Sequence, residues 1–246
     1  MSIADLKPGP ADTRAAAPPL IEAVRALFNS GVAVAITDPR MTYPPGFAAE
    51  IAAMARATPA RRREFAAGRA ALHRAMADLG HAPRPVLAGA DRAPVWPDSV
   101  VGSLSHSATT CVAVMGEARA LRSLGVDVEE DTALDDDLIP QICTLAERAW
   151  LASQPGDRRA RLAKLIFSAK ECAYKCQYPL TSTGFDFDTL EITPDIDTGQ
   201  FEATFTRDIG QFVAGHCLHG RFVIRDGLIV TGTMLTHRPR WSIQGR

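Results

Sequence analysis

The sequence is poor in lysine, in aromatic residues and in long apolar runs. Only four of its 27 basic residues are lysine, and aromatic residues make up 7% of the chain. No apolar stretch approaches the roughly 18 residues that a membrane-spanning helix needs, so we expect no membrane span. The net charge of −1 excludes a protein that binds nucleic acid through bulk positive charge.

Cysteine pairs with CxxC spacing and a signal-peptide pattern in the first residues are also lacking. The five cysteines show no CxxC spacing, and the first residues do not follow the signal-peptide pattern of a charged start before an apolar run. We therefore expect reduced thiols and a cytoplasmic location. Cys217, with His216 and His219 beside it in sequence, could form a metal site, but ordinary polar positions of a loop and a strand explain these residues better.

Charge is distributed unevenly along the 246 residues, a length that suits one large domain or two small ones. Residues 56–74 contain six arginines and one glutamate, whereas residues 127–137 contain seven acids and no base. Arginine presents a planar set of donors that suits phosphate. The arginine-rich region therefore offers a place for an anionic ligand.

A helix is expected from Pro59 to Leu79. Thr58 is a good N-cap, proline suits the first helical position, and the glycine after the helix suits its end. Arg62 and Arg69 fall at the edge of the apolar stripe, where they either face a cleft or cover the core margin with their aliphatic stems. Spacing alone favours the second interpretation. The arginines expected to point away from the stripe are Arg63 and Arg74.

The rest of the chain alternates expected strands and helices. Strands are expected at residues 31–36, 111–115, 125–130, 190–192, 201–205 and 222–235, with a hairpin turn at Asp226-Gly227. Helices are expected after the capping box of Thr144 and Glu147 and over residues 161–177. Residues 81–99, rich in proline, are expected to form a structured loop. The order of elements indicates two similar halves that meet near residue 125.

The segment GVDVEE, Gly125–Glu130, places two carboxylates on an apolar strand. Side chains two residues apart on a strand share a face, so Asp127 and Glu129 point the same way. They repel each other unless a cation lies between them, and oxygen ligands favour Mg²⁺ or Ca²⁺. Replacing Asp127 should therefore leave the fold intact and relieve repulsion. The alternative is a strand end that turns into solvent.

The segment KLIFSAKECAYK, Lys164–Lys175, has the spacing of an amphipathic helix. Its apolar face consists of Leu162, Leu165, Ile166, Ala169, Ala173 and Cys176, and its polar face of Lys164, Ser168, Glu171 and Lys175. One interpretation is a solvated face with a Glu171–Lys175 surface pair worth about 0.3–0.5 kcal/mol. The other is a carboxylate held beside an ammonium group, ready to bind a metal and to accept a proton.

The segment GSLSHS, Gly102–Ser107, precedes the strand expected at residues 111–115. Its glycine and serine residues expose backbone N–H groups, and His106 adds a donor, which together suit a phosphate. A polar turn is the alternative. A serine–histidine nucleophile pair is not favoured, because adjacent residues of an extended chain point apart and no orienting acid is evident.

In chain order, the segments GSLSHS, LGVDVEE and FSAKECAYK resemble the signature segments of the 4'-phosphopantetheinyl transferase superfamily, in particular the type that includes enterobactin synthase component D. The likeness extends upstream through RRREFAAGRAAL and downstream through YPLTSTGFDF, from about Arg61 to Phe187. Three ordered segments with matching flanks make the resemblance specific.

The resemblance implies ligands for Mg²⁺ and for coenzyme A. Asp127, Glu129 and Glu171 would hold Mg²⁺ against the pyrophosphate of coenzyme A, and His106 would lie near its 3'-phosphate. Asp91 stands where the family has a basic residue in a loop, which is a departure from the pattern. The remaining residues implied to bind coenzyme A are Arg62, Arg69, Arg92, Ser105 and Lys175, with Leu180 and Thr181 along the pantetheine arm.

The resemblance also implies an α+β fold of two similar α/β halves, residues 1–124 and 125–246. A pseudo-twofold axis would relate them, with coenzyme A in the cleft between. The reaction would transfer 4'-phosphopantetheine to a serine of an apo acyl, aryl or peptidyl carrier protein and release adenosine 3',5'-bisphosphate. Glu171 would act as base and Lys175 would stabilise the pyrophosphate. The alternatives are an inactive coenzyme A-binding partner protein and an unrelated Mg²⁺-dependent nucleotide hydrolase. We expect a monomer.

Overall fold

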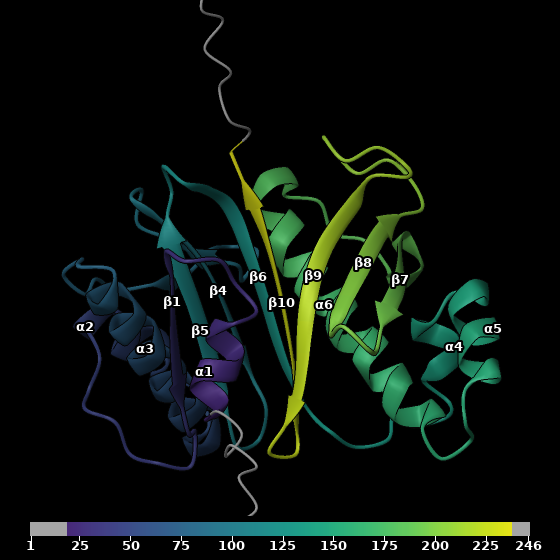
Figure 1. Cartoon of the computed structure of the whole chain (residues 1–246). Helices are drawn as coiled ribbons and strands as arrows, with labels where there is room; N and C mark the ends of the chain where they lie inside the picture. Colours follow the sequence, from purple (N-terminus) through teal and green to yellow (C-terminus); the bar gives the residue numbers. More distant parts are fainter. Residues whose placement is uncertain (1–18, 238–246) are drawn as a thin grey trace, which may run out of the picture.

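Two antiparallel sheets form the centre of the protein (Figure 1), whose computed structural model describes residues 19–237. The smaller sheet has the order β1-β5-β4, with β1 at Val32–Thr37, β4 at Val100–His106 and β5 at Cys111–Glu117. The larger sheet has the order β6-β10-β9-β8-β7, with β6 at Leu121–Glu130, β7 at Leu190–Asp195, β8 at Gln200–Phe205, β9 at Cys217–Arg225 and β10 at Leu228–Thr236. A short hairpin pairs β2, Leu87–Ala88, with β3, Pro94–Val95.

Two long helices pack against these sheets, which confirms a mixed α and β fold. The helices are α1 (Leu20–Arg25), α2 (Ala48–Ala53), α3 (Pro59–Asp78), α4 (Ile139–Ile142), α5 (Leu145–Ser153) and α6 (Arg159–Thr181), followed by a 3-10 turn, η1 (Phe187–Thr189). Figure 1 shows α3 beside the smaller sheet and α6 beside the larger one, with β6 and β10 between them. Among the described residues, no helix is both long and apolar enough to cross a membrane.

Short sequence patterns correctly predicted the start of two helices and one hairpin turn. Thr58 Oγ1 accepts a hydrogen bond from the backbone N–H of Arg61 at 3.3 Å, as expected for the N-cap of α3. Thr144 and Glu147 form the expected capping box at α5. Asp226 and Gly227, with φ of 53° and 74°, make the tight turn between β9 and β10, because a two-residue hairpin loop of this type needs positive φ at both positions.

Other elements differ from the expectation. The GSLSHS segment is most of strand β4 rather than a polar turn, and it pairs with β5 along its whole length. Helix α6 is longer than expected and continues to Thr181 with Pro179 inside it. The short helices α1, α2 and α4 were not anticipated, because a few residues carry too little periodicity to reveal a helix.

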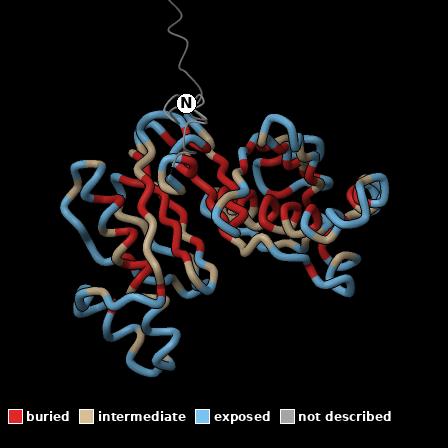
Figure 2. The backbone as a smooth tube through the Cα atoms, turned by 60° about the horizontal axis from the view of Figure 1, so that its bottom comes forward, coloured by how far each residue is buried: buried red, intermediate tan, exposed pale blue. Residues whose placement is uncertain are grey.

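Strand β6 is an edge strand of the larger sheet and lies beside β4 of the smaller one, and its two faces differ. Leu124, Val126 and Val128 are fully buried in a core cluster that also contains residues of α1 and of the smaller sheet. The opposite face, which includes Gly125 and Asp127, looks toward α6. A Cβ atom on Gly125 would lie 2.1 Å from the carbonyl oxygen of Cys172 in α6, so only glycine permits this close approach. In Figure 2 the buried backbone runs through these central strands and α6.

Candidate functional site

Asp127 is the centre of a buried polar network where β4, β6 and α6 meet. Its Oδ1 accepts hydrogen bonds from Ser105 Oγ at 2.8 Å and from Lys175 Nζ at 2.6 Å. Its Oδ2 accepts one from Ser168 Oγ at 2.8 Å. The Asp127 residue is 2% exposed and Ser168 is 0% exposed. The carboxylate therefore accepts hydrogen bonds from one residue of β4 and two residues of α6, and with Asp127 itself on β6 all three sequence segments meet in this network.

Lys175 pairs with the strand rather than with its helical neighbour. Its Nζ donates to Ser105 Oγ at 2.9 Å as well as to Asp127, and no ion pair joins it to Glu171 among the described residues. The predicted Glu171–Lys175 surface pair is therefore wrong. Burial alone would lower the pKa of Lys175, but the charge of Asp127 and the hydrogen bond to it raise that pKa above its usual value.

The other two predicted metal ligands lie on the same side of β6. Glu129 is half-buried, with Oε2 3.6 Å from Lys164 Nζ. Burial raises its pKa, and the charge of Asp127 adds to the rise. Burial also raises the pKa of Glu171, where Lys175 opposes the shift and Asp127 adds to it. The charge of Asp127 thus acts on both glutamates, and the ammonium groups of Lys164 and Lys175 lie beside these carboxylates.

The donor chemistry of these three carboxylates fits Mg²⁺. All their ligand atoms are oxygens, which hard cations prefer. Burial is the main cause of the raised pKa of both glutamates, the charge of Asp127 adds to it, and a cation would oppose both effects. Within residues 19–237, one group of three possible metal ligands has all its ligand atoms within 4.8 Å of one another. That group consists of Glu202, Cys217 and His219 on β8 and β9, and not of the three carboxylates. His216, the residue suggested by sequence proximity, is not part of that group.

A cavity of about 500 Å³ opens between the β2–β3 hairpin, β4 and α6. Arg92 of the hairpin segment lines it, as do Lys175 and Tyr174 of α6, so two cationic side chains from different elements reach this cavity. Leu180 and Thr181 do not line this cavity: Leu180 packs against the core of the larger sheet, and Thr181 Oγ1 donates to Gln177 Oε1 at 2.6 Å.

His106 lies at the end of β4 beside Arg61, which the sequence analysis did not single out. Arg61 Nη1 is 3.3 Å from His106 Nε2 and 3.0 Å from Glu64 Oε2. Burial lowers the pKa of His106, the positive charge of Arg61 lowers it further, and Glu64 opposes both. Arg61 is the first arginine of α3, one position before the predicted Arg62. Only the position of β4 reveals which of the two faces His106.

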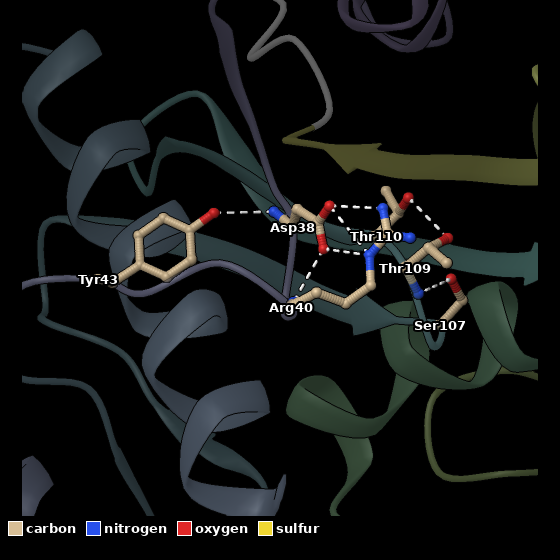
Figure 3. A network of polar contacts seen from close by, with 6 residues as sticks. All are labelled: Asp38, Arg40, Tyr43, Ser107, Thr109 and Thr110. Carbon is tan, nitrogen blue, oxygen red and sulfur yellow. Dashed lines mark hydrogen bonds and ion pairs between the residues drawn. The ribbon is translucent and has the colours of Figure 1, made fainter.

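The turn that follows His106 is rich in hydroxyl groups (Figure 3). Thr109 N donates to Ser107 Oγ at 3.3 Å, and the hydroxyl oxygens of Thr109 and Thr110 lie 3.4 Å apart. Asp38, which follows β1, accepts from Arg40 Nε at 2.9 Å. The pairing of β1 with β5 brings this ion pair close to the turn.

Arg62 and Arg69 line a second cavity, of about 510 Å³, between α2 and α3. Arg62 donates through Nη2 to the carbonyl oxygen of Ala55 at 2.6 Å. Arg69 is buried, with its Cζ 4.1 Å from the centre of the Phe65 ring and its Nε 3.8 Å from Glu50 Oε1. The structure therefore does not bring these two arginines to His106, and their predicted role depends on the resemblance alone. Arg63 and Arg74 are exposed, as expected.

Comparison with known proteins gives a consistent result. Residues 49–116 match the model of the 4'-phosphopantetheinyl transferase N-terminal domain, and residues 123–225 match that of the 4'-phosphopantetheinyl transferase superfamily. The chain is 39% identical over 189 residues to 4'-phosphopantetheinyl transferase Svp of Streptomyces mobaraensis, which covers 75% of this chain and 76% of that protein. It is 35% identical over 204 residues to 4'-phosphopantetheinyl transferase PptT of Mycobacterium tuberculosis, covering 78% and 88%. Enterobactin synthase component D of Escherichia coli is 37% identical over 127 residues, covering 51% and 59%.

Proposed function

The chain belongs to the 4'-phosphopantetheinyl transferase superfamily, and on this premise we propose that the network around Asp127 is its active site. The protein transfers 4'-phosphopantetheine to carrier proteins, as its relatives of that name indicate. One observation carries the placement of the site: Asp127 joins Ser105 and Lys175 in one set of hydrogen bonds. The three residues come from the three segments that resemble the family.

Coenzyme A would lie in the cavity of about 500 Å³ between the hairpin and α6. Support comes from Arg92 and Lys175 on its walls and from the Arg61–His106 pair at the end of β4, which suits the 3'-phosphate. Arg92 and Lys175 line this cavity, and Ser105 accepts a hydrogen bond from Lys175. The proposed roles of Arg62, Arg69, Leu180 and Thr181 rest on the resemblance alone, because Arg62 and Arg69 line the other cavity and Leu180 and Thr181 do not line this one.

Mg²⁺ would be held by Asp127, Glu129 and Glu171, and it would neutralise charge on the pyrophosphate when bound. In the structure, Lys164 forms an ion pair with Glu129, and Lys175 forms one with Asp127. Lys175 carries three N–H donors, of which Asp127 and Ser105 take two, so the third is available for a phosphate oxygen.

Glu171 would act as the general base of the transfer. The carrier's serine hydroxyl attacks the phosphorus that bears the pantetheine arm, and its proton passes to the Glu171 carboxylate. The bond from this phosphorus to the bridging oxygen breaks, and the electron pair leaves with adenosine 3',5'-bisphosphate. Because burial raises the pKa of Glu171 toward neutral pH, the carboxylate is better suited to accept a proton there.

Residues 1–124 and 125–246 would form two halves related by a pseudo-twofold axis. In the part of each half that is described, the first strand of the sheet pairs with the last: β1 with β5, and β6 with β10. A long helix, α3 or α6, follows that first strand and packs against the same sheet. The boundary falls inside β6, which would therefore serve both halves. A monomeric state stays a prediction.

A transfer assay with an apo carrier protein tests the proposed site. Mass spectrometry should show that the carrier gains the pantetheine arm when the protein, coenzyme A and Mg²⁺ are all present, and chelation of the metal should stop the gain. A coenzyme A-binding partner protein would bind the ligand and leave the carrier unmodified. A nucleotide hydrolase would consume coenzyme A with no change in carrier mass.

A further inference from the structure

The β2–β3 hairpin forms one wall of the coenzyme A cavity but has little structure of its own. Each strand has two residues, and the pairing consists of Leu87 with Val95 and Ala88 with Pro94. A two-stranded hairpin of this kind is marginally stable in water. Arg92, at its tip, must nevertheless be held in place if it is to meet a phosphate across the cavity from Lys175.

Asp91 fixes the tip of the hairpin through one carboxylate oxygen. Its Oδ1 accepts a hydrogen bond from the backbone N–H of Ala93 at 3.0 Å, and the N–H of Arg92 donates to the carbonyl of Gly89 at 3.0 Å. These bonds hold Arg92 at a φ of 68°, a left-handed conformation that costs energy for a residue with a side chain. The position of Arg92 thus depends on the Asp91 carboxylate.

The second oxygen of the same carboxylate joins the hairpin to α6. Tyr178, near the end of α6, donates through its hydroxyl to Asp91 Oδ2 at 2.9 Å. Among the described residues, no other hydrogen bond connects residues 87–95 with α6. Tyr178, Asp91 and Arg92 all line the cavity of about 500 Å³. One tyrosine hydroxyl therefore spans the cleft and ties its two walls together.

From these contacts we propose that Tyr178 is a positioning residue for coenzyme A. Its hydrogen bond to Asp91 holds the hairpin against α6 and keeps Arg92 at the cavity wall. This also explains why an acid stands where the family pattern has a basic residue, because a lysine at position 91 has no lone pair to accept the tyrosine hydroxyl. The inference rests on the proposed placement of coenzyme A in this cavity.

Tyr178→Phe tests the proposal because it removes only the hydroxyl. Backbone hydrogen exchange at residues 87–95 should become faster. The Kd and the KM for coenzyme A should rise about three- to tenfold, the range for one lost hydrogen bond, while kcat stays unchanged because Asp127 and Glu171 are untouched. Tyr43→Phe is the matched control, since its hydroxyl accepts from Asp38 N at 2.8 Å in a loop outside the cavity. That variant should leave exchange at the hairpin and both constants unaltered.

A double-mutant cycle separates the hydrogen bond from other effects. Asp91→Asn leaves one acceptor oxygen, which cannot serve both the backbone N–H of Ala93 and the Tyr178 hydroxyl. The variant combining it with Tyr178→Phe should therefore bind coenzyme A no more weakly than the weaker single variant. Unchanged hairpin exchange and unchanged Kd in Tyr178→Phe would overturn the proposal, as would a loss confined to kcat. If the unaltered protein itself does not bind coenzyme A in calorimetry, the placement of the ligand is wrong instead.

Discussion

The ammonium group of Lys175 lies 2.6 Å from the carboxylate of Asp127, although 48 residues separate them in sequence. Replacing Asp127 therefore leaves a cation and the hydroxyls of Ser105 and Ser168 without their buried acceptor. The expectation that its loss spares the fold overlooked these partners. Asp127→Ala should lower the free energy of unfolding by about 3–5 kcal/mol, as for other broken buried pairs. Urea denaturation measures this, with the half-buried Glu129→Ala as a control that should change stability far less.

Glu171→Gln should give a folded protein that binds coenzyme A and is nearly inactive. The apolar face of α6 is untouched, so circular dichroism and the urea midpoint should stay near those of the unaltered protein. Transfer to an apo carrier should fall on the order of 10²-fold or more, the usual contribution of a general base. Glu202→Gln, the same change on the exposed face of β8, should keep full activity. Near-normal transfer by Glu171→Gln would remove Glu171 from the mechanism.

Arg61→Ala should weaken coenzyme A binding, because Arg61 lies 3.3 Å from His106 at the proposed 3'-phosphate position. The loss of a charge-assisted phosphate contact costs about 1.5–3 kcal/mol. Arg63→Ala, two positions along the same helix and exposed to solvent, should cost close to nothing. Calorimetric titration with coenzyme A compares the two variants, and equal losses would disprove this assignment of the helix face.

Coenzyme A should bind more tightly at pH 6 than at pH 8 because of His106. Burial and Arg61 hold the pKa of His106 below its usual value in the free protein, whereas a bound phosphate favours the imidazolium and raises that pKa. A group whose pKa rises on binding contributes affinity that is present below the free pKa and is lost as pH rises through the bound pKa. The affinity for coenzyme A should change about tenfold for each unit by which binding raises the pKa of His106.

Titration calorimetry across pH measures this effect, and His106→Gln controls for the ionisation of the phosphate itself. The unaltered protein should show the steeper pH dependence. Parallel curves for the two proteins would mean that His106 does not meet the phosphate.

A second buried ion pair supports α6 from its other side. Lys170 Nζ lies 2.8 Å from Glu147 Oε2, and both side chains are 1% exposed. Lys170→Met should lower the free energy of unfolding by about 3–5 kcal/mol, because it leaves a buried carboxylate without its cation. Lys164→Met, the same change on the same helix beside the partly exposed Glu129, should cost less than about 1 kcal/mol. Urea denaturation of the two variants makes the comparison, and similar losses would contradict it.

Sequence reasoning succeeded where neighbouring residues alone decide the structure. The cap at Thr58, the capping box of Thr144 and the Asp226-Gly227 turn each depend on a few adjacent residues. The shared face of Asp127 and Glu129 was also predictable, because strand geometry fixes it. The order of the three family-like segments then indicated which of these residues to propose for the chemistry.

Sequence reasoning failed where contact with a segment distant in the chain decides the structure. Periodicity places Ser168 on the polar face of α6 but does not reveal that β6 and β10 cover that face and leave the residue 0% exposed. Lys175 has a local partner in sequence, yet its partner in space is Asp127. Arg61 and Arg62 differ by one position, about 100° around a helix, and only the placement of β4 shows which of them meets His106.

Gly125 contributes no side chain to this protein, yet it sets the distance between β6 and α6, and so between the side chains proposed to carry the reaction. Because a Cβ atom there would lie 2.1 Å from the Cys172 carbonyl oxygen, any other amino acid would push α6 outward from β6. Lys175 and Glu171 would then retreat together from Asp127. We expect such a change to reduce transfer although every proposed catalytic side chain is retained, so these side chains alone would not distinguish an active member of the family from an inactive one.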